Sequence, residues 1–222
     1  MKQFIPLMFG LSFSTLGLSA DVNGQRFDRA AFYKEKIRTI AKANQSNPNR
    51  LIIRNILDPM VNSLIELKES QREDQKVDLV AGTWKSLWSD QEFGKGTDYS
   101  QVYQVVNPDG YYYNISKVQT EGGASTAYLR GQFDSLGSYL AIEFTANSIQ
   151  PGFPAAGTDL VELAEGVESG DTQTTPIPGP IGVTGVLMNI YVDADLRIVY
   201  GNSVVDTRPR LFILERVDHL EN

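Results

Sequence analysis

From Val77 onward apolar residues alternate with polar ones, and this period of two most constrains the fold. Turn residues divide the alternation into eight segments, approximately at 79–90, 100–107, 110–119, 124–133, 138–148, 183–193, 195–201 and 209–216. Because successive side chains of a strand point to opposite faces, each segment predicts a strand with one apolar face. Eight consecutive antiparallel strands predict a mainly β protein that closes as an up-and-down barrel. A β-sandwich has a similar strand count and stays open as an alternative.

The sixth and seventh segments meet at an acidic bend, Asp193-Ala194-Asp195. The alternation on both sides predicts a hairpin in which the aspartates cap backbone amides at the turn. Arg197 lies just beyond the bend, and its guanidinium either pairs with Asp193 or folds back over the sheet. Because an arginine would hold either aspartate ionised, we do not expect an acid–base catalytic pair here.

Residues 21–76 predict a helical segment and a linker before the barrel. Apolar residues at helical spacing favour a helix over 27–43. Asn47-Pro48 and Asp58-Pro59 each have the pattern of a helix start, so further helices are expected over 49–57 and from 59 to about 70. These helices share an apolar stripe, which we expect to pack on the barrel rather than lie on a membrane: Ile53, Leu57, Met60, Leu64 and Leu67.

Residues 1–20 have the pattern of a secretory signal peptide. Lys2 precedes a short apolar run, and the run ends in Leu18-Ser19-Ala20, which predicts cleavage after Ala20. The apolar run is too short to favour a membrane span, so no integral span is expected after cleavage. The pattern predicts an exported protein, secreted or periplasmic. A plastid destination stays open, because the first step of plastid import would leave a similar pattern.

Composition excludes several classes of function. The net charge is -7 and no Lys/Arg cluster is present, which argues against a nucleic-acid partner. The chain has no cysteine, and its single histidine, His219, falls in the polar C-terminal tail. A thiol nucleophile, a disulfide framework and a histidine-based triad are therefore excluded. We expect a protein that is not an enzyme and that needs neither a cofactor nor a metal.

Two motifs carry a resemblance to a known family. Gly82-Thr83-Trp84 is similar to the opening-strand motif of lipocalins, and the pattern Tyr191-x-Asp193-x-Asp195-Leu196-Arg197-Ile198, followed by Gly201, resembles the C-terminal signature of the plastid-lipid-associated (PAP)/fibrillin family. The resemblance covers about residues 30–217. It implies a lipocalin-like barrel over 77–222 that associates with lipid bodies (plastoglobules in a photosynthetic eukaryote) or carries a lipophilic molecule. It also implies an arginine stacked over Trp84, and Arg197, Arg210 and Arg216 are the candidates.

The chain departs from the family pattern at Val192, at Tyr200 and in a longer insert over 150–181. Five of the ten prolines lie in this insert, and 159–166 predicts a brief acidic helix. A long loop of this kind either covers the barrel mouth and gates a ligand or is a surface excursion without a role.

The alternation also predicts which side chains contact a ligand. Trp84 and Trp88 are expected on one face of the first strand, as are Tyr111, Tyr113 and Ile115 on the third. The predicted ligand-binding residues are Trp84, Trp88, Tyr113, Phe144, Met188 and Phe212. An aromatic interior of this kind suits a quinone, a terpenoid or an acyl chain. We expect Trp88 to serve the ligand more than the fold, and Trp84 the reverse.

These observations favour non-catalytic binding of a hydrophobic small molecule or a lipid surface. The alternative is an exported carbohydrate- or protein-binding β-sandwich, with exposed tyrosines and tryptophans as sugar platforms. The oligomeric state and the ligand are not predicted.

Overall fold

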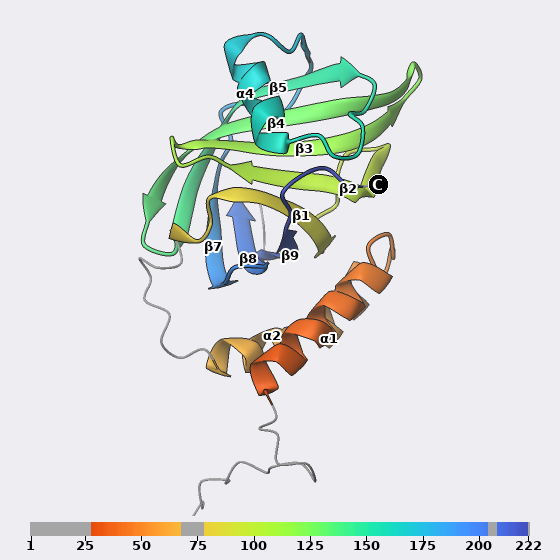
Figure 1. Cartoon of the computed structure of the whole chain (residues 1–222). Coiled ribbons are helices and arrows are strands. Elements are labelled where there is room, and N and C mark those ends of the chain that lie inside the picture. The colour runs from red at the N-terminus through yellow and green to blue at the C-terminus, as the bar shows by residue number, and fades with distance from the viewer. Residues whose placement is uncertain (1–27, 68–77, 204–207, 222) are drawn as a thin grey trace, which may run out of the picture.

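A computed structural model describes residues 28–67, 78–203 and 208–221 (Figure 1). These residues form three helices and nine strands, in the order α1 (Arg29–Ala43), α2 (Arg50–Leu67), β1 (Gly82–Ser89), β2 (Thr97–Val106), β3 (Tyr111–Thr120), β4 (Gly123–Leu136), β5 (Tyr139–Pro151), α4 (Leu160–Ser169), β6 (Thr175–Pro176), β7 (Thr184–Val192), β8 (Leu196–Ser203) and β9 (Arg210–Arg216). The predicted signal peptide at 1–20 lies outside the described residues, and so does the last part of the predicted helical segment and linker, residues 68–76.

Eight of the strands close into a ring. Their order is β4-β3-β2-β1-β9-β8-β7-β5, and β5 pairs again with β4, while the two-residue β6 is added at the side of β5. Every pairing is antiparallel. Neighbours in the ring are consecutive in the chain with two exceptions: β5 pairs with β7, because β6 lies beside the ring, and β1, the first strand, pairs with β9, the last. The predicted eight-stranded antiparallel barrel is therefore confirmed. A closed ring leaves no two separate sheets, so the β-sandwich alternative is wrong.

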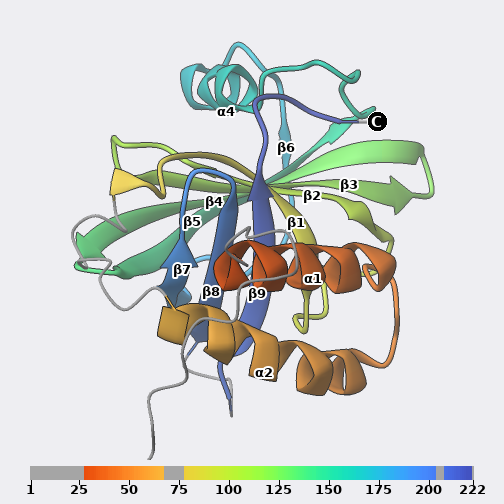
Figure 2. The same cartoon turned by 60° about the horizontal axis from the view of Figure 1, so that its bottom comes forward.

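Helices α1 and α2 lie together on one side of the barrel (Figure 2). Asp28 caps α1 by accepting a hydrogen bond from the amide of Ala31 at 3.0 Å. The two further helices predicted over 49–57 and 59–70 are one helix, α2, with Pro59 inside it, so that prediction is wrong. An interior proline costs about 3 kcal/mol, but a single buried stripe runs through the joint and favours one continuous helix. The stripe is formed by Ile53, Leu57, Val61 and Leu64.

The insert at 150–181 places α4 on the opposite side of the barrel (Figure 1). Asp159 caps this helix by accepting hydrogen bonds from the amides of Val161 and Glu162. The acidic helix predicted over 159–166 is confirmed, although it continues to Ser169. Leu160 and Ala164 are buried against the tyrosines of β2, β3 and β4, so α4 packs on the outer wall of the barrel.

Three separate clusters of apolar side chains hold these layers together. The inner cluster fills the barrel around Trp84, the helix cluster lies between the barrel and α1/α2 around Trp88, and the α4 cluster lies under α4 around Tyr113. Within the described ranges, no helix has the length and apolar character needed to cross a membrane.

Candidate functional site

The inside of the barrel is the first candidate site, because it is apolar and aromatic and differs between its two ends. At one end the inward-facing side chains are buried: Trp84, Val106, Tyr112, Val192 and Leu214. Toward the other end Leu140 and Ile142 are still buried, at 1% and 4% exposed, but four inward-facing side chains are half-buried: Phe133, Phe144, Leu187 and Phe212. Solvent reaches these four side chains although they belong to the inner cluster. The barrel is therefore closed at the Trp84 end and more open at the Phe212 end.

Arg216 closes the Trp84 end. Its guanidinium carbon lies 4.2 Å from the centre of the Trp84 ring, and Trp84 donates its indole N–H to the carbonyl of Val80 at 2.7 Å. Arg216 also donates to the carbonyls of Ala81 and Ala194, at 2.9 and 2.8 Å. These bonds fix a cation over the ring face. Of the three candidate arginines, Arg216 lies nearest to the Trp84 ring, and Arg197 also lies near it, at 5.9 Å from its centre.

Gly82 makes this closure possible. Its φ is +121°, in a region that favours glycine, and a Cβ atom built there would lie 2.4 Å from Nη1 of Arg216. The glycine of the Gly-x-Trp motif therefore provides the space through which the arginine reaches the tryptophan.

Arg197 lies inside the barrel and is fully buried. Its Nε donates to the amide oxygen of Asn189 at 2.8 Å, and its Nη1 donates to that of Gln104 at 3.1 Å. Its Nη2 is buried and has no hydrogen-bond partner among the described residues. Burial lowers the pKa of Arg197 to about 10, since removal from water disfavours the charged form.

The acidic bend is a structural anchor for α1. Lys34 lies 2.8 Å from Asp193 and 2.7 Å from Asp195, and Arg38 lies 2.6 Å from Asp195. Of the two alternatives for Arg197, the pairing with Asp193 is wrong, because both aspartates pair with helix α1 and Arg197 points inward. Burial alone raises the pKa of Asp193, but its hydrogen bonds with Asp195, Lys34 and Tyr191 outweigh burial and hold that pKa well below the usual range.

Three of the six predicted ligand-binding residues lie in the inner cluster: Trp84, Phe144 and Phe212. The other three lie elsewhere. Trp88 belongs to the helix cluster, because a bulge between Ser86 and Trp88 reverses the alternation of β1. The prediction that Trp84 and Trp88 share a face is therefore wrong.

Tyr113 and Met188 also face away from the inner cluster. Tyr113 belongs to the α4 cluster, where its hydroxyl donates to the carboxylate of Glu168. Met188 pairs across the ladder with Tyr200, which packs against the helix cluster, so the outward face of β7 carries Met188. In each of these strands a neighbouring residue faces inward instead, namely Tyr112 in β3 and Leu187 in β7.

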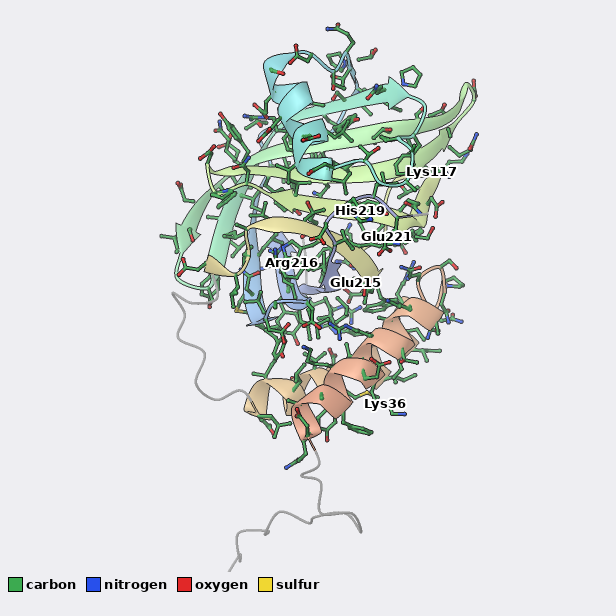
Figure 3. The ribbon with its side chains drawn as sticks, viewed as in Figure 1. Lys36, Lys117, Glu215, Arg216, His219 and Glu221 are labelled. Atoms are coloured by element: carbon green, nitrogen blue, oxygen red, sulfur yellow. The ribbon has the colours of Figure 1, made fainter. Side chains whose placement is uncertain are left out.

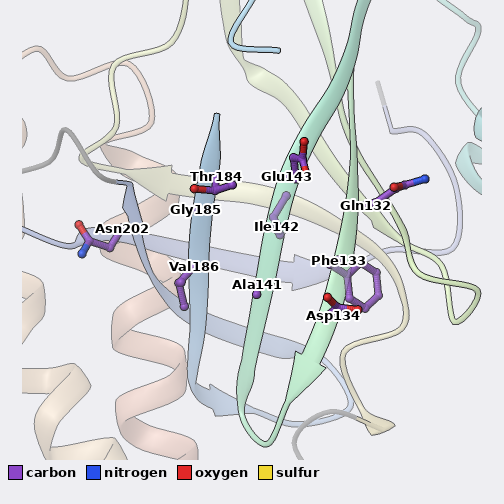
Figure 4. A pocket seen from close by; sticks show the side chains of 10 residues that line it. All are labelled: Gln132, Phe133, Asp134, Ala141, Ile142, Glu143, Thr184, Gly185, Val186 and Asn202. Carbon is purple, nitrogen blue, oxygen red and sulfur yellow. The ribbon is translucent and has the colours of Figure 1, made fainter. Parts of the chain in front are cut away.

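An open depression of about 480 Å³ lies along β4, β5 and β7 (Figure 4). Its lining includes Phe133 and Ile142 of the inner cluster together with the exposed side chains of Asp134, Glu143 and Val186. The lining holds two carboxylates and no basic side chain. This depression therefore does not attract an anionic molecule.

The outward face of α2 is a second apolar surface. Leu51, Ile52 and Ile56 are 55%, 58% and 43% exposed, and Pro59 is exposed on the same helix. In the first half of α2, Arg54 turns toward the barrel, and Arg50 and Asp58 are half-buried. Over the first three turns this face is therefore uncharged and mostly apolar, with the exposed amide of Asn55 between the apolar side chains.

Groups that bind metals do not gather in the described part of the chain, where no cluster of three or more His, Cys, Asp and Glu side chains occurs. His219 is exposed, beyond the end of β9 (Figure 3). Comparisons of the chain with protein-family models, with curated proteins and with solved structures find no match. The resemblance to the PAP/fibrillin family therefore stays a prediction that rests on the two motifs.

Proposed function

We propose that this protein binds a hydrophobic small molecule inside the barrel, without catalysis. The observation that carries the proposal is the change in burial along the inner cluster, from a closed end at Trp84 to half-buried aromatic and aliphatic side chains at Phe144, Leu187 and Phe212. Apolar surface that solvent reaches inside a concave wall favours an apolar ligand, at about 25 cal/mol per Å² before ordering costs.

The alternative reading as a carbohydrate-binding protein has less support. Trp84, Trp88, Tyr112 and Tyr113 are each at most 2% exposed, so none of them presents a ring to a sugar. Tyr111 is half-buried, and its ring is covered by the guanidinium of Arg130 at 4.5 Å.

Adjacent residues of β7 test the interior directly, because Leu187 belongs to the inner cluster and Val186 is 39% exposed. Leu187→Trp is expected to weaken binding of the neutral dye Nile red at least about tenfold, by filling the interior. Val186→Trp adds the same side chain outside and is expected to change affinity less than about twofold. Circular dichroism checks that both variants fold. Equal losses from the two variants, or no dye binding by the unaltered chain, would contradict the proposal.

The exposed face of α2 supports a second candidate, association with a lipid surface. Three large apolar side chains on one uncharged helix face have the arrangement of a helix that lies in a membrane interface. Ile52→Glu combined with Ile56→Glu is expected to abolish flotation with phosphatidylcholine vesicles, while Asn62→Glu, an exposed site of the same helix, is not. Flotation that survives the double substitution would exclude this surface.

A further inference from the structure

Arg197 carries a buried charge that the described residues do not neutralise. Its side chain is fully buried inside the barrel, and no described carboxylate pairs with it. Among the described residues, its hydrogen-bond acceptors are the amide oxygens of Asn189 and Gln104, which are neutral dipoles. A buried charge without a counter-ion is strongly unfavourable, and proteins usually pair such a group.

The surroundings of Arg197 add positive charge rather than a counter-ion. Arg216, a second cation, also lies near the Trp84 ring, and the guanidinium carbons of Arg197 and Arg216 are 5.9 and 4.2 Å from its centre. Asn189 is fully buried and Gln104 is 5% exposed. Both amides thus fix the orientation of the guanidinium, with its Nε and Nη1 occupied and Nη2 left without an acceptor.

Arg197 begins a row of inward-facing residues on β8 that leads to the more open end of the barrel. Along β8 the inward-facing positions are Arg197, Val199 and Gly201, and a Cβ atom at Gly201 would lie 2.7 Å from the Phe212 ring and 3.1 Å from Leu187. Four residues of strand span about 13 Å. The inward row of β8 therefore runs from a cation at the closed end to apolar side chains at the half-buried end.

We propose that the guanidinium of Arg197 binds the carboxylate of the ligand, so that the barrel takes an amphiphile with one anionic head and an apolar tail, head inward. This inference rests on the proposed binding function and narrows its ligand class. The carboxylate accepts from Nη2, and the tail lies along Val199 toward Phe212. A charge-assisted hydrogen bond from Nη2 to a carboxylate is stronger than one to a neutral head group, so a quinone or an uncharged terpenoid is the weaker ligand.

Two ligands of equal tail length test the head group. Dodecanoate and dodecanol are titrated below micelle formation at pH 8, by displacement of Nile red from the full chain. The unaltered protein is expected to bind dodecanoate at least about tenfold more tightly than dodecanol, as expected for a charge-assisted hydrogen bond. Arg197→Met is expected to bring the ratio of the two affinities close to one while dodecanol binding stays within about threefold.

Arg130→Met is the matched control, since Arg130 pairs with Glu168 outside the barrel, and it is expected to leave the ratio unchanged. Equal binding of acid and alcohol by the unaltered chain overturns this inference and leaves the proposed function standing. Failure to bind either ligand overturns both. If Arg197→Met does not fold, the ratio measured on the unaltered chain still decides whether the barrel prefers an anionic head group. A preference for the acid that survives Arg197→Met overturns the role of Arg197.

Discussion

Asp90 joins α2 to the barrel through a carboxylate that is fully buried. Its Oδ2 accepts a hydrogen bond from Nη1 of Arg54 at 2.8 Å, and its Oδ1 accepts one from the amide of Leu211 at 2.6 Å. Arg208 lies 3.3 Å from the same carboxylate. The side chain of Arg54 is only 10% exposed, so both members of this ion pair are removed from water.

Asp90→Asn is expected to destabilise the protein by about 3 kcal/mol. The asparagine keeps the shape of the side chain and an acceptor for Leu211, but it removes the charge that Arg54 faces. Loss of one partner from a buried ion pair costs about 3–5 kcal/mol, and we expect the lower end because Arg54 retains Asp58 at 2.5 Å. With an m-value of about 2 kcal/mol/M, the urea midpoint falls by about 1.5 M.

The measurement is urea unfolding followed by far-ultraviolet circular dichroism. Asp58→Asn is the matched control, because it removes the other carboxylate of the same arginine at a site that is 35% exposed. A partly exposed pair contributes about 0.2–1 kcal/mol, so the midpoint is expected to move by less than about 0.5 M. Equal shifts for the two variants would refute the argument that burial decides the value of these pairs.

Two further predictions concern the packing of the barrel and its acid stability. Because Trp84 and Trp88 are both at most 1% exposed, Trp84→Ala and Trp88→Ala are each expected to cost about 3–5 kcal/mol in urea unfolding; a difference above about 2 kcal/mol between them would contradict this. The folded-state pKa of Asp193 is depressed, so its stabilising contribution is complete above the unfolded pKa of about 3.9 and is lost as the pH falls toward the folded value. The melting temperature is therefore expected to fall less steeply between pH 6 and pH 2 for Asp193→Asn than for the unaltered protein. Parallel plots of melting temperature against pH would argue against this role of Asp193.

The strands were predictable from the sequence because alternation is a local signal that the barrel preserves. The faces of some strands were not predictable, because bulges shift the alternation by one residue. The register shifts between Ser86 and Trp88 in β1, and between Asn189 and Tyr191 in β7. The extra residue of a bulge needs no particular residue type at these positions, so alternation alone does not mark it.

Helix α2 and Arg197 illustrate two other limits. Asp58-Pro59 has the local pattern of a helix start, but the buried residues on both sides of Pro59 outweigh it, and that packing depends on the barrel. Arg197 lies in β8, where no bulge occurs and Arg197 shares the inward face with Val199. Strict alternation therefore places Arg197 with an inward apolar residue, and this signal would have identified it as an internal charge.

The bulge in β1 also places the two tryptophan fluorophores of the chain in separate environments. The chain has only two tryptophans, and four positions along one strand divide them between the barrel interior and the contact with α1 and α2. Emission from a Trp84→Phe variant then reports the docking of the helices alone, and emission from a Trp88→Phe variant reports the closed end of the barrel. Unfolding curves that separate between these variants would reveal that the helices detach before the barrel opens.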